Sequence, residues 1–277
     1  MKIKTGWMVA VLMTCAGSAF AAGSPGGVSV DEIVRKANHM ALYQGEDGRG
    51  RVEMVITDRQ GRTRKRVFAM LRKDDGEGDR DQRYYVLFHE PADVRRTVFM
   101  VHKHAAPGKD DDRWLYLPGL DLVKRIASSD KRTSFVGSDF LYEDISGRSV
   151  TEDRHELLRT TDRHYVVKNV PKQPHTVEFA YYLAYVDRKS FMPVKMEFFK
   201  KADRLYRVIE VERLENVAAR EKGRAVGYPT VMKTVAQDLD TGSRTEMVFS
   251  AVGYNSGLKD DLFSERYLRK PPREAVR

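Results

Sequence analysis

Alternation of apolar and polar residues with a period of two is the feature that most constrains the fold of this chain. In residues 51–57 the side chains of Val52, Met54 and Ile56 fall on one face, and residues 66–72 repeat the pattern. Successive side chains of a strand point to opposite faces of a sheet, so each segment predicts a strand with one buried face. Further strands are predicted at residues 84–89, 97–102, 114–117, 123–126, 165–170, 177–187, 194–199, 205–214, 230–239 and 244–252.

The longest of these runs is apolar on both faces. Residues 177, 179, 181, 183 and 185 form one face, and Ala180, Tyr182, Ala184 and Val186 make most of the other face apolar as well. A sheet with one face in water alternates cleanly, so this part of the sheet is covered on both sides or curves around something. Turn residues, among them Pro118-Gly119 and residues 240–243, join consecutive strands. We therefore expect about eleven or twelve strands in one strongly curved antiparallel sheet, a mainly β (α+β) fold.

Few helices are expected. The clearest follows Ser29 and Asp31, either of which can cap it, and Glu32 completes a capping box with Ser29. Apolar residues then recur at helical spacing as far as Ala41, and Gly45 lies beyond the last of them. We also expect short helices near residues 128–132, 149–158 and 259–268.

The first residues have the pattern of a secretory signal peptide. Lys2 and Lys4 precede a short apolar core, and small residues end at Ala21, where we place cleavage. Residues 22–277 are then expected to form a single domain, without cysteine, in the periplasm. The alternative is a lipoprotein anchored through Cys15, although the small residues of a lipoprotein signal do not precede it. No later stretch approaches the ~20 apolar residues of a spanning helix.

The chain is basic, with a formal net charge of +9 at pH 7, or +7 once Lys2 and Lys4 are removed with the signal peptide. For an exported protein this charge favours anionic lipid headgroups or envelope polymers as partners rather than nucleic acid. A basic surface that is merely well solvated explains the same number.

The sequence lacks the common catalytic motifs: no Gly-x-Ser-x-Gly elbow, phosphate-binding loop, dinucleotide fingerprint or His-Glu-x-x-His pair is present. Two weak metal candidates remain, His102 and His104 with the acidic residues 110–112, and Asp139 with Glu143 and Asp144. Solvated loop residues explain the first group better, and the second lacks the ligand at every second residue and the central glycine of a calcium loop. We therefore predict no enzyme, no metal and no cofactor.

Aromatic and aliphatic residues provide the strongest signal. Trp114 and Tyr116 share one face of their strand, with Leu115 and Leu117 on the other. Further aromatics follow at positions 135, 140, 142, 181, 182, 185, 198 and 199. A packed core accounts for any one of them. The alternative is an apolar concave surface, and such a surface needs a lid or a ligand because a large apolar area does not stay exposed in water.

Two of these segments carry a family resemblance. "WLYLPGLDLVKRI" (114–126) followed by "SFVGSDFLYEDI" (134–145) resembles the signature of a larger branch of the LolA-like outer-membrane lipoprotein-sorting proteins. Segments 88–100, 185–199 and 260–268 resemble the same family. The resemblance implies an incomplete antiparallel β-barrel, with helices over its hydrophobic concave face. It also implies a periplasmic carrier that shields acyl chains of a lipid or lipoprotein and delivers them within the envelope, with a membrane transporter as a possible donor or acceptor.

Candidate binding residues follow from this reading. For the acyl chains they are Met54, Phe99, Trp114, Tyr116, Phe135, Phe140, Tyr142 and Phe198. For an anionic headgroup they are Lys124, Arg125 and Arg132. Adaptable methionines suit such a pocket, and the further candidates are Met70, Met100, Met196 and Met247.

Two other functions stay open. A non-carrying accessory protein would dock on an envelope transporter or assembly complex, with its concave face filled by side chains. A periplasmic hydrolase would need a wet cleft around Asp139, Glu143 and Asp144. We interpret Gly137-Ser138-Asp139 as a turn or a bend at a strand edge, in which Asp139 bonds local backbone N–H groups rather than performing chemistry.

Overall fold

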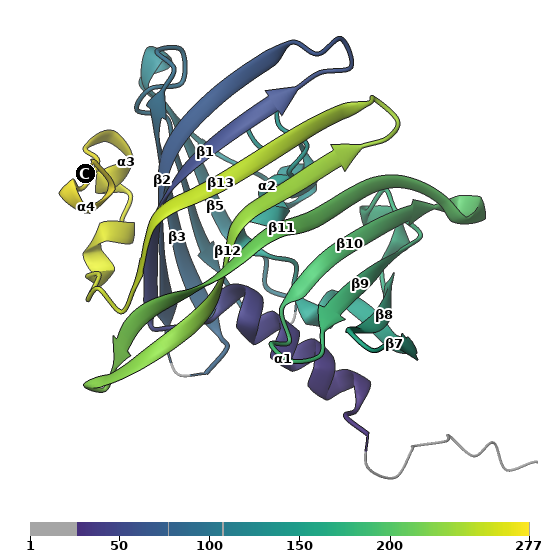
Figure 1. The fold of residues 1–277 in the computed structure, drawn as a ribbon. Coiled ribbons are helices and arrows are strands. Elements are labelled where there is room, and N and C mark those ends of the chain that lie inside the picture. The colour runs from purple at the N-terminus through teal and green to yellow at the C-terminus, as the bar shows by residue number, and fades with distance from the viewer. Residues whose placement is uncertain (1–26, 77, 107, 277) are drawn as a thin grey trace, which may run out of the picture.

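A computed structural model describes residues 27–276 apart from positions 77 and 107. The predicted signal peptide (1–21), its cleavage site and Cys15 lie outside the described residues. The described chain forms one antiparallel sheet of thirteen strands, in the order β6-β5-β4-β3-β2-β1-β13-β12-β11-β10-β9-β8-β7. Figure 1 shows this sheet curving around a concave side without closing into a barrel. The predicted mainly β, open half-barrel is confirmed.

The sheet consists of two meanders of consecutive strands. The first contains β1 (Asp47–Thr57), β2 (Thr63–Asp75), β3 (Asp81–Glu90), β4 (Val98–Lys103), β5 (Asp112–Leu117) and β6 (Leu122–Arg125). The second contains β7 (Asp153–Thr160), β8 (His164–Pro171), β9 (Tyr181–Asp187), β10 (Pro193–Lys200), β11 (Arg204–Glu221), β12 (Arg224–Asp238) and β13 (Ser243–Tyr254). The meanders meet where β1 pairs with β13, with Met54 opposite Met247.

The helices are short and lie on both sides of the sheet. Helix α1 (Val30–Leu42) crosses the concave side, and α2 (Tyr142–Ser146) belongs to the connection from β6 to β7. Helices α3 (Arg266–Arg269) and α4 (Arg273–Val276) lie outside the curve of the sheet, as Figure 1 shows. Short 3₁₀ helices η1 to η6 occupy Pro118–Leu120, Ser128–Arg132, Val150–Glu152, Pro174–Thr176, Lys201–Asp203 and Asp260–Phe263. In the described part of the chain, no helix is long and apolar enough to cross a membrane.

Two apolar clusters explain why several strands lack a polar face. On the concave side, Met54, Phe68, Phe99 and Phe135 belong to the larger cluster. On the convex side, Leu71, Met100 and Trp114 pack against residues of the C-terminal segment, including Leu262 and Leu268. Strands β2 to β5 are therefore buried on both faces, and the sequence pattern there reflects two cores rather than one.

The sequence predicted twelve of the thirteen strands. It was wrong at residues 149–158, where we expected a helix and the structure has η3 followed by β7. The strand is the outer edge of the sheet, and much of it is exposed, so its alternation is weak. Its pairing with β8, in which Leu157 lies opposite Val167, determines the conformation. The predicted cap is confirmed, since the hydroxyl of Ser29 accepts a hydrogen bond from the backbone N–H of Glu32 at 3.2 Å.

Candidate functional site

An apolar cavity of about 450 Å³ lies between helix α1 and the concave face of the sheet. The helix supplies Val34, Met40, Ala41 and Leu42 to its wall. The second meander supplies, among others, Tyr182, Ala184, Val186, Met196, Phe198, Ile209, Val231, Met247 and Phe249. The segment before β7 closes a further side with Phe140, Leu141 and Ile145.

Helix α1 holds this position because two of its faces are apolar. Ile33 and Ala37 are buried with Val167 and Val186 of β8 and β9. Val34 and residues 40–42 line the cavity, and Ala37 lies at the boundary because it belongs to both groups. An amphipathic helix of this kind gains most of its stability from packing rather than from helix propensity.

A buried arginine fixes the carboxyl end of α1. The guanidinium of Arg72 on β2 donates hydrogen bonds of 2.7 Å to the backbone carbonyls of Leu42, Gln44 and Gly45. Leu42 is the last residue of α1, and Gln44 and Gly45 follow it, so the arginine binds carbonyls at and just beyond the helix end and places a positive charge at the negative end of the helix dipole. Asp74, 2.9 Å away, balances that charge.

Two glycines of β1 leave room in the floor of the cavity. Gly48 and Gly50 lie on the concave face, where a Cβ atom would approach the side chains of Tyr254 and Val252 at about 3.5 Å. Neither glycine has a positive φ angle, so the backbone conformation does not require glycine here. The missing side chains instead leave space in the cavity.

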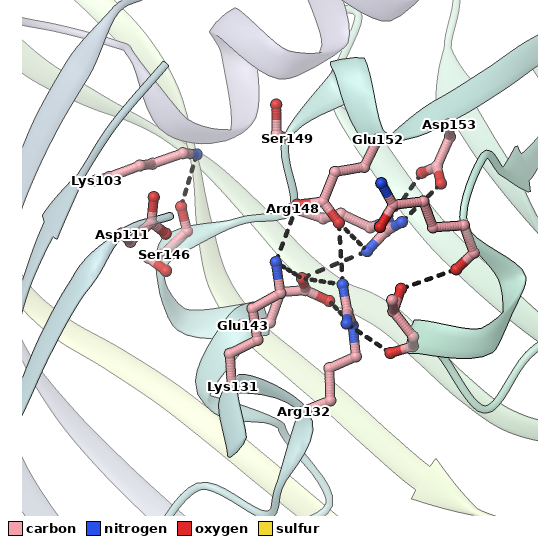
Figure 2. A network of polar contacts seen from close by, with 12 residues as sticks. Lys103, Asp111, Lys131, Arg132, Glu143, Ser146, Arg148, Ser149, Glu152 and Asp153 are labelled. Atoms are coloured by element: carbon pink, nitrogen blue, oxygen red, sulfur yellow. Dashed lines mark hydrogen bonds and ion pairs between the residues drawn. The ribbon is translucent and has the colours of Figure 1, made fainter. Parts of the chain in front are cut away.

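A cluster of six charged side chains, which Figure 2 draws, lies in and next to the segment between β6 and β7, and two of its members, Glu143 and Arg148, line the cavity. Glu143 of α2 accepts from Arg132 at 3.1 Å and lies 3.3 Å from Lys131 and 3.4 Å from Arg148. Glu152 lies 3.0 Å from Lys131, 2.9 Å from Arg132 and 2.6 Å from Arg148.

Asp153 completes this cluster by accepting two hydrogen bonds from Arg148, at 2.9 and 2.8 Å. Burial alone would lower the pKa of Arg148, but the bonds to Asp153 and the charge of Glu143 raise it above its ordinary value. The hydroxyl of Tyr182 donates to Asp153 at 3.0 Å, and burial together with that carboxylate raises the tyrosine pKa well above its ordinary value. Three cations and three anions cancel, so the cluster presents no net charge to the cavity.

The segment 134–145 is held by side chains of the second meander. Arg207 of β11 forms an ion pair with Asp144 and donates to the backbone carbonyl of Asp139 at 3.2 Å. Burial raises the pKa of Asp144, and the charge of Arg207 opposes that rise. The prediction for Asp139 was wrong: its carboxylate accepts hydrogen bonds from the hydroxyls of Ser243 and Thr245 rather than from local backbone N–H groups. The predicted turn itself is present, since the backbone N–H of Ser138 donates to the carbonyl of Phe135 at 3.0 Å, and β13 holds it through Asp139.

The predicted acyl-binding residues separate into three groups. Phe140 and Phe198 line the cavity. Four others, Met54, Phe99, Phe135 and Tyr142, are packed into the adjoining concave core, where the ring of Phe135 lies 5.7 Å from that of Phe99 and 5.4 Å from that of Tyr142.

Trp114 and Tyr116, the third group, lie on the convex face against the C-terminal segment. Placing them on the same surface as Phe140 was wrong, because their strand is buried on both faces and the alternation does not show which face is concave. Among the predicted methionines, Met70, Met196 and Met247 line the cavity, whereas Met100 lies on the convex face.

The predicted headgroup residues do not converge. Arg132 belongs to the buried ionic cluster. Arg125, on the edge strand β6, forms an ion pair with Asp112 of β5 and lies over the ring of Trp114 at 5.5 Å. Lys124 is exposed on the same strand. None of the three lines the cavity.

Several residues that line the cavity were not predicted as binding residues from the sequence, among them Val34, Met40, Ala184 and Met192. Ala184 could have been predicted, because it lies on the second apolar face of the run at 177–187.

The weak metal candidates are engaged in other ways. His102 contacts the backbone carbonyl of Phe263 at 2.7 Å, and His104 lies between Asp81 and Asp112 at 3.2 and 3.1 Å. The described residues contain no group of three or more His, Cys, Asp or Glu side chains placed to hold a metal ion.

An open, curved sheet with a helix over an apolar cavity defines the half-barrel class of proteins. A model of a family described as uncharacterized matches residues 80–270. A crystal structure of a DUF1329 family protein from Desulfovibrio piger is 27% identical, with a TM-score of 0.74 over 86% of this chain and 97% of that one. A domain from Vibrio parahaemolyticus, described as an outer membrane lipoprotein-sorting protein domain, is 25% identical, with a TM-score of 0.73 and the same coverage.

A LolA superfamily protein from Nitrosomonas europaea shares the fold, at 20% identity and a TM-score of 0.63 over 87% of this chain and all of that one. No curated protein matches the chain. The chain belongs to the family whose model matches residues 80–270, and its structure is similar to an outer membrane lipoprotein-sorting protein domain, in agreement with the resemblance of its central segments.

Proposed function

We propose that this protein is a cell-envelope carrier that shields acyl chains of a lipid or lipoprotein in the cavity beneath α1. The observation that carries the proposal is the apolar lining of that cavity, whose volume of about 450 Å³ is within the ~300–1,000 Å³ of ligand pockets. The similarity to a domain described as lipoprotein-sorting supports the same class of cargo. Phe140 and Phe198 are the residues from the sequence prediction that we retain as acyl contacts.

The chemistry of the walls favours an uncharged, flexible chain. Burial of each methylene contributes about 0.8 kcal/mol, and the methionines of the lining adapt to chains of different shape. Three arginines of the lining are already paired, Arg72 with Asp74, Arg148 with Asp153 and Arg207 with Asp144. The fourth, Arg49, is exposed to solvent, so we infer that a charged headgroup stays at the mouth.

The location and partners follow from the same proposal. A carrier of this kind works in the periplasm after removal of residues 1–21, as a single domain over residues 22–277. It needs no cofactor, and its donor or acceptor is a membrane component such as a transporter.

Filling the cavity tests the proposal. Ala184 faces the cavity from the middle of β9, opposite Met196 and Val167 of its neighbours. The variant Ala184→Trp occupies the space that an acyl chain needs, whereas Leu183→Trp adds a similar ring on the opposite face of the same strand. We expect Ala184→Trp to bind a fluorescent fatty acid at least ten-fold more weakly than wild type, and Leu183→Trp to bind it normally.

Organic extracts of the protein, purified gently from its own envelope, provide the second measurement. Mass spectrometry is expected to find acyl lipid in the wild type and much less in Ala184→Trp. Wild-type extracts without acyl lipid in several preparations, together with no binding of the fluorescent probe, would contradict the carrier and favour the accessory role.

A further inference from the structure

The turn between β5 and β6 presents an apolar tip to solvent. Leu120 ends the 3₁₀ helix Pro118–Leu120 and is 73% exposed, the largest value among the exposed large apolar residues of the described chain. Leu122 follows at 45% exposed. Water-facing leucines of this kind, two on one narrow turn, bring no stability to the fold.

The C-terminal segment is tied to this turn by an arginine. Arg269 of α3 donates to the carboxylate of Asp121 at 2.9 Å and to its backbone carbonyl at 3.3 Å. This pair neutralises the only acidic residue of the turn. The guanidinium of Arg96 in turn donates to the backbone carbonyl of Arg269 at 3.5 Å, so the loop between β3 and β4 joins the same surface.

Three further cations lie together next to Arg269. Arg95, Arg96 and Lys270 line a hollow beside Val276, another exposed apolar residue. None of the three forms an ion pair with a described residue: Arg95 and Arg96 donate only to backbone carbonyls. Arg96 also has a φ of 67°, a left-handed conformation that favours glycine, so an arginine at this position costs backbone energy.

We propose that this edge, formed by Leu120, Leu122, Val276, Arg95, Arg96 and Lys270, docks on the surface of a bilayer that contains anionic lipids. Small apolar side chains insert at the boundary of headgroups and acyl chains while cations bind the phosphates. A protein partner would need roughly 800 Å² on each side, which two leucines on a turn and one valine do not provide. This inference goes beyond the proposed cargo and holds whether or not the cavity carries lipid.

Flotation with lipid vesicles tests the docking edge. The purified protein is mixed with vesicles of phosphatidylglycerol and phosphatidylcholine, or of phosphatidylcholine alone, and its partitioning is measured. We expect clear binding to the anionic vesicles and a sharp decrease at 0.5 M salt. The variant Leu120→Ser/Leu122→Ser is expected to bind about ten-fold more weakly, or more, because it loses the inserting side chains.

Removing the cations is expected to abolish the preference for anionic vesicles. The variant is Arg95→Ser/Arg96→Asn/Lys270→Ser, with asparagine at the left-handed position, and each lost cation is expected to weaken binding about five-fold. Its matched control lies at the distant turn between β11 and β12, where Arg220→Ser/Lys222→Asn/Arg224→Ser also includes one left-handed residue. Leu239→Ser, at an exposed leucine of the β12–β13 turn, controls for the leucine variant.

A tryptophan at the tip provides a direct readout of insertion. In Leu120→Trp we expect the emission to shift to shorter wavelength with anionic vesicles and to be quenched by brominated acyl chains, whereas Leu239→Trp shows neither change. Two results would overturn the proposal: wild type that does not float with anionic vesicles, or variants of the docking edge that bind as wild type does while circular dichroism shows them folded.

Discussion

Glu143 is the residue on which the buried ionic cluster depends most directly. Its side chain is 7% exposed and lies within 3.4 Å of nitrogen atoms from Lys131, Arg132 and Arg148. The substitution Glu143→Gln keeps the size and shape of the side chain and removes one negative charge. Three buried cations then face only Glu152 and Asp153.

The expected cost follows from that imbalance. Breaking a buried ion pair by removing one partner costs about 3–5 kcal/mol, because the remaining charge is left uncompensated away from water. For a chain of this size, a loss of that order lowers the melting temperature by about 10 °C. The effect should also reach the cavity, since the segment that carries Phe140 and Ile145 is held to β7 through this cluster.

Thermal unfolding followed by circular dichroism measures the loss, with an exposed ion pair as the control. Glu53 lies 2.6 Å from Lys65, and its side chain is 49% exposed. We expect Glu53→Gln to melt within about 1 °C of wild type, because water screens such pairs. If Glu143→Gln also melts within about 2 °C of wild type, the cluster does not hold the segment and the reasoning fails.

Three further predictions concern single positions. Burial lowers the pKa of Lys103 to about 8, so between pH 8 and 10.5 the unfolded chain holds a proton that the folded protein has released, and stability rises with pH there. The free energy of unfolding of wild type minus that of Lys103→Met should therefore increase from pH 8 to 10 in urea titrations. A constant difference would contradict the lowered pKa. Phe135 is fully buried among four aromatic rings. Its replacement by alanine should lower the free energy of unfolding by about 3–5 kcal/mol, measured by urea unfolding. Gly147 has φ 79°, and a Cβ there would lie 2.3 Å from Leu42 Cδ1, whereas Gly223 has φ 81° and no atom within 4 Å. Gly147→Ala should therefore lower the melting temperature by clearly more than Gly223→Ala. Equal losses would mean that backbone strain alone determines the effect of both substitutions.

The fold was more predictable than the faces of its strands. Alternation located most of the twelve strands because at least one face of each is largely apolar; β6, which is mostly exposed, was located by the Pro118-Gly119 turn before it. It could not assign Trp114 and Phe99 to opposite sides, since β4 and β5 are buried on both and either phase of the pattern fits. Strand β7 was missed for the opposite reason, because an exposed edge strand shows little alternation.

The candidate site was predictable only where a motif marked it. The segment 134–145 directed attention to Phe140, which lines the cavity. The partners of Glu143 are near it in sequence, yet nothing in the residue order of 131–153 shows that three cations and three acids converge. That arrangement depends on the path of the connection across the concave side, which only the folded sheet determines.

The pairing of β1 with β13 has a consequence for how the chain folds. Each meander forms from neighbouring strands, but this one contact joins residues about 200 positions apart, such as Arg51 and Ser250. Closing so long a loop is slow, and contacts of this kind make folding of β-rich chains slow. Until the two meanders join, each has an uncovered apolar surface and a free strand edge. Refolding should therefore lose yield as protein concentration rises, and early association of the first meander with a chaperone would favour the native sheet.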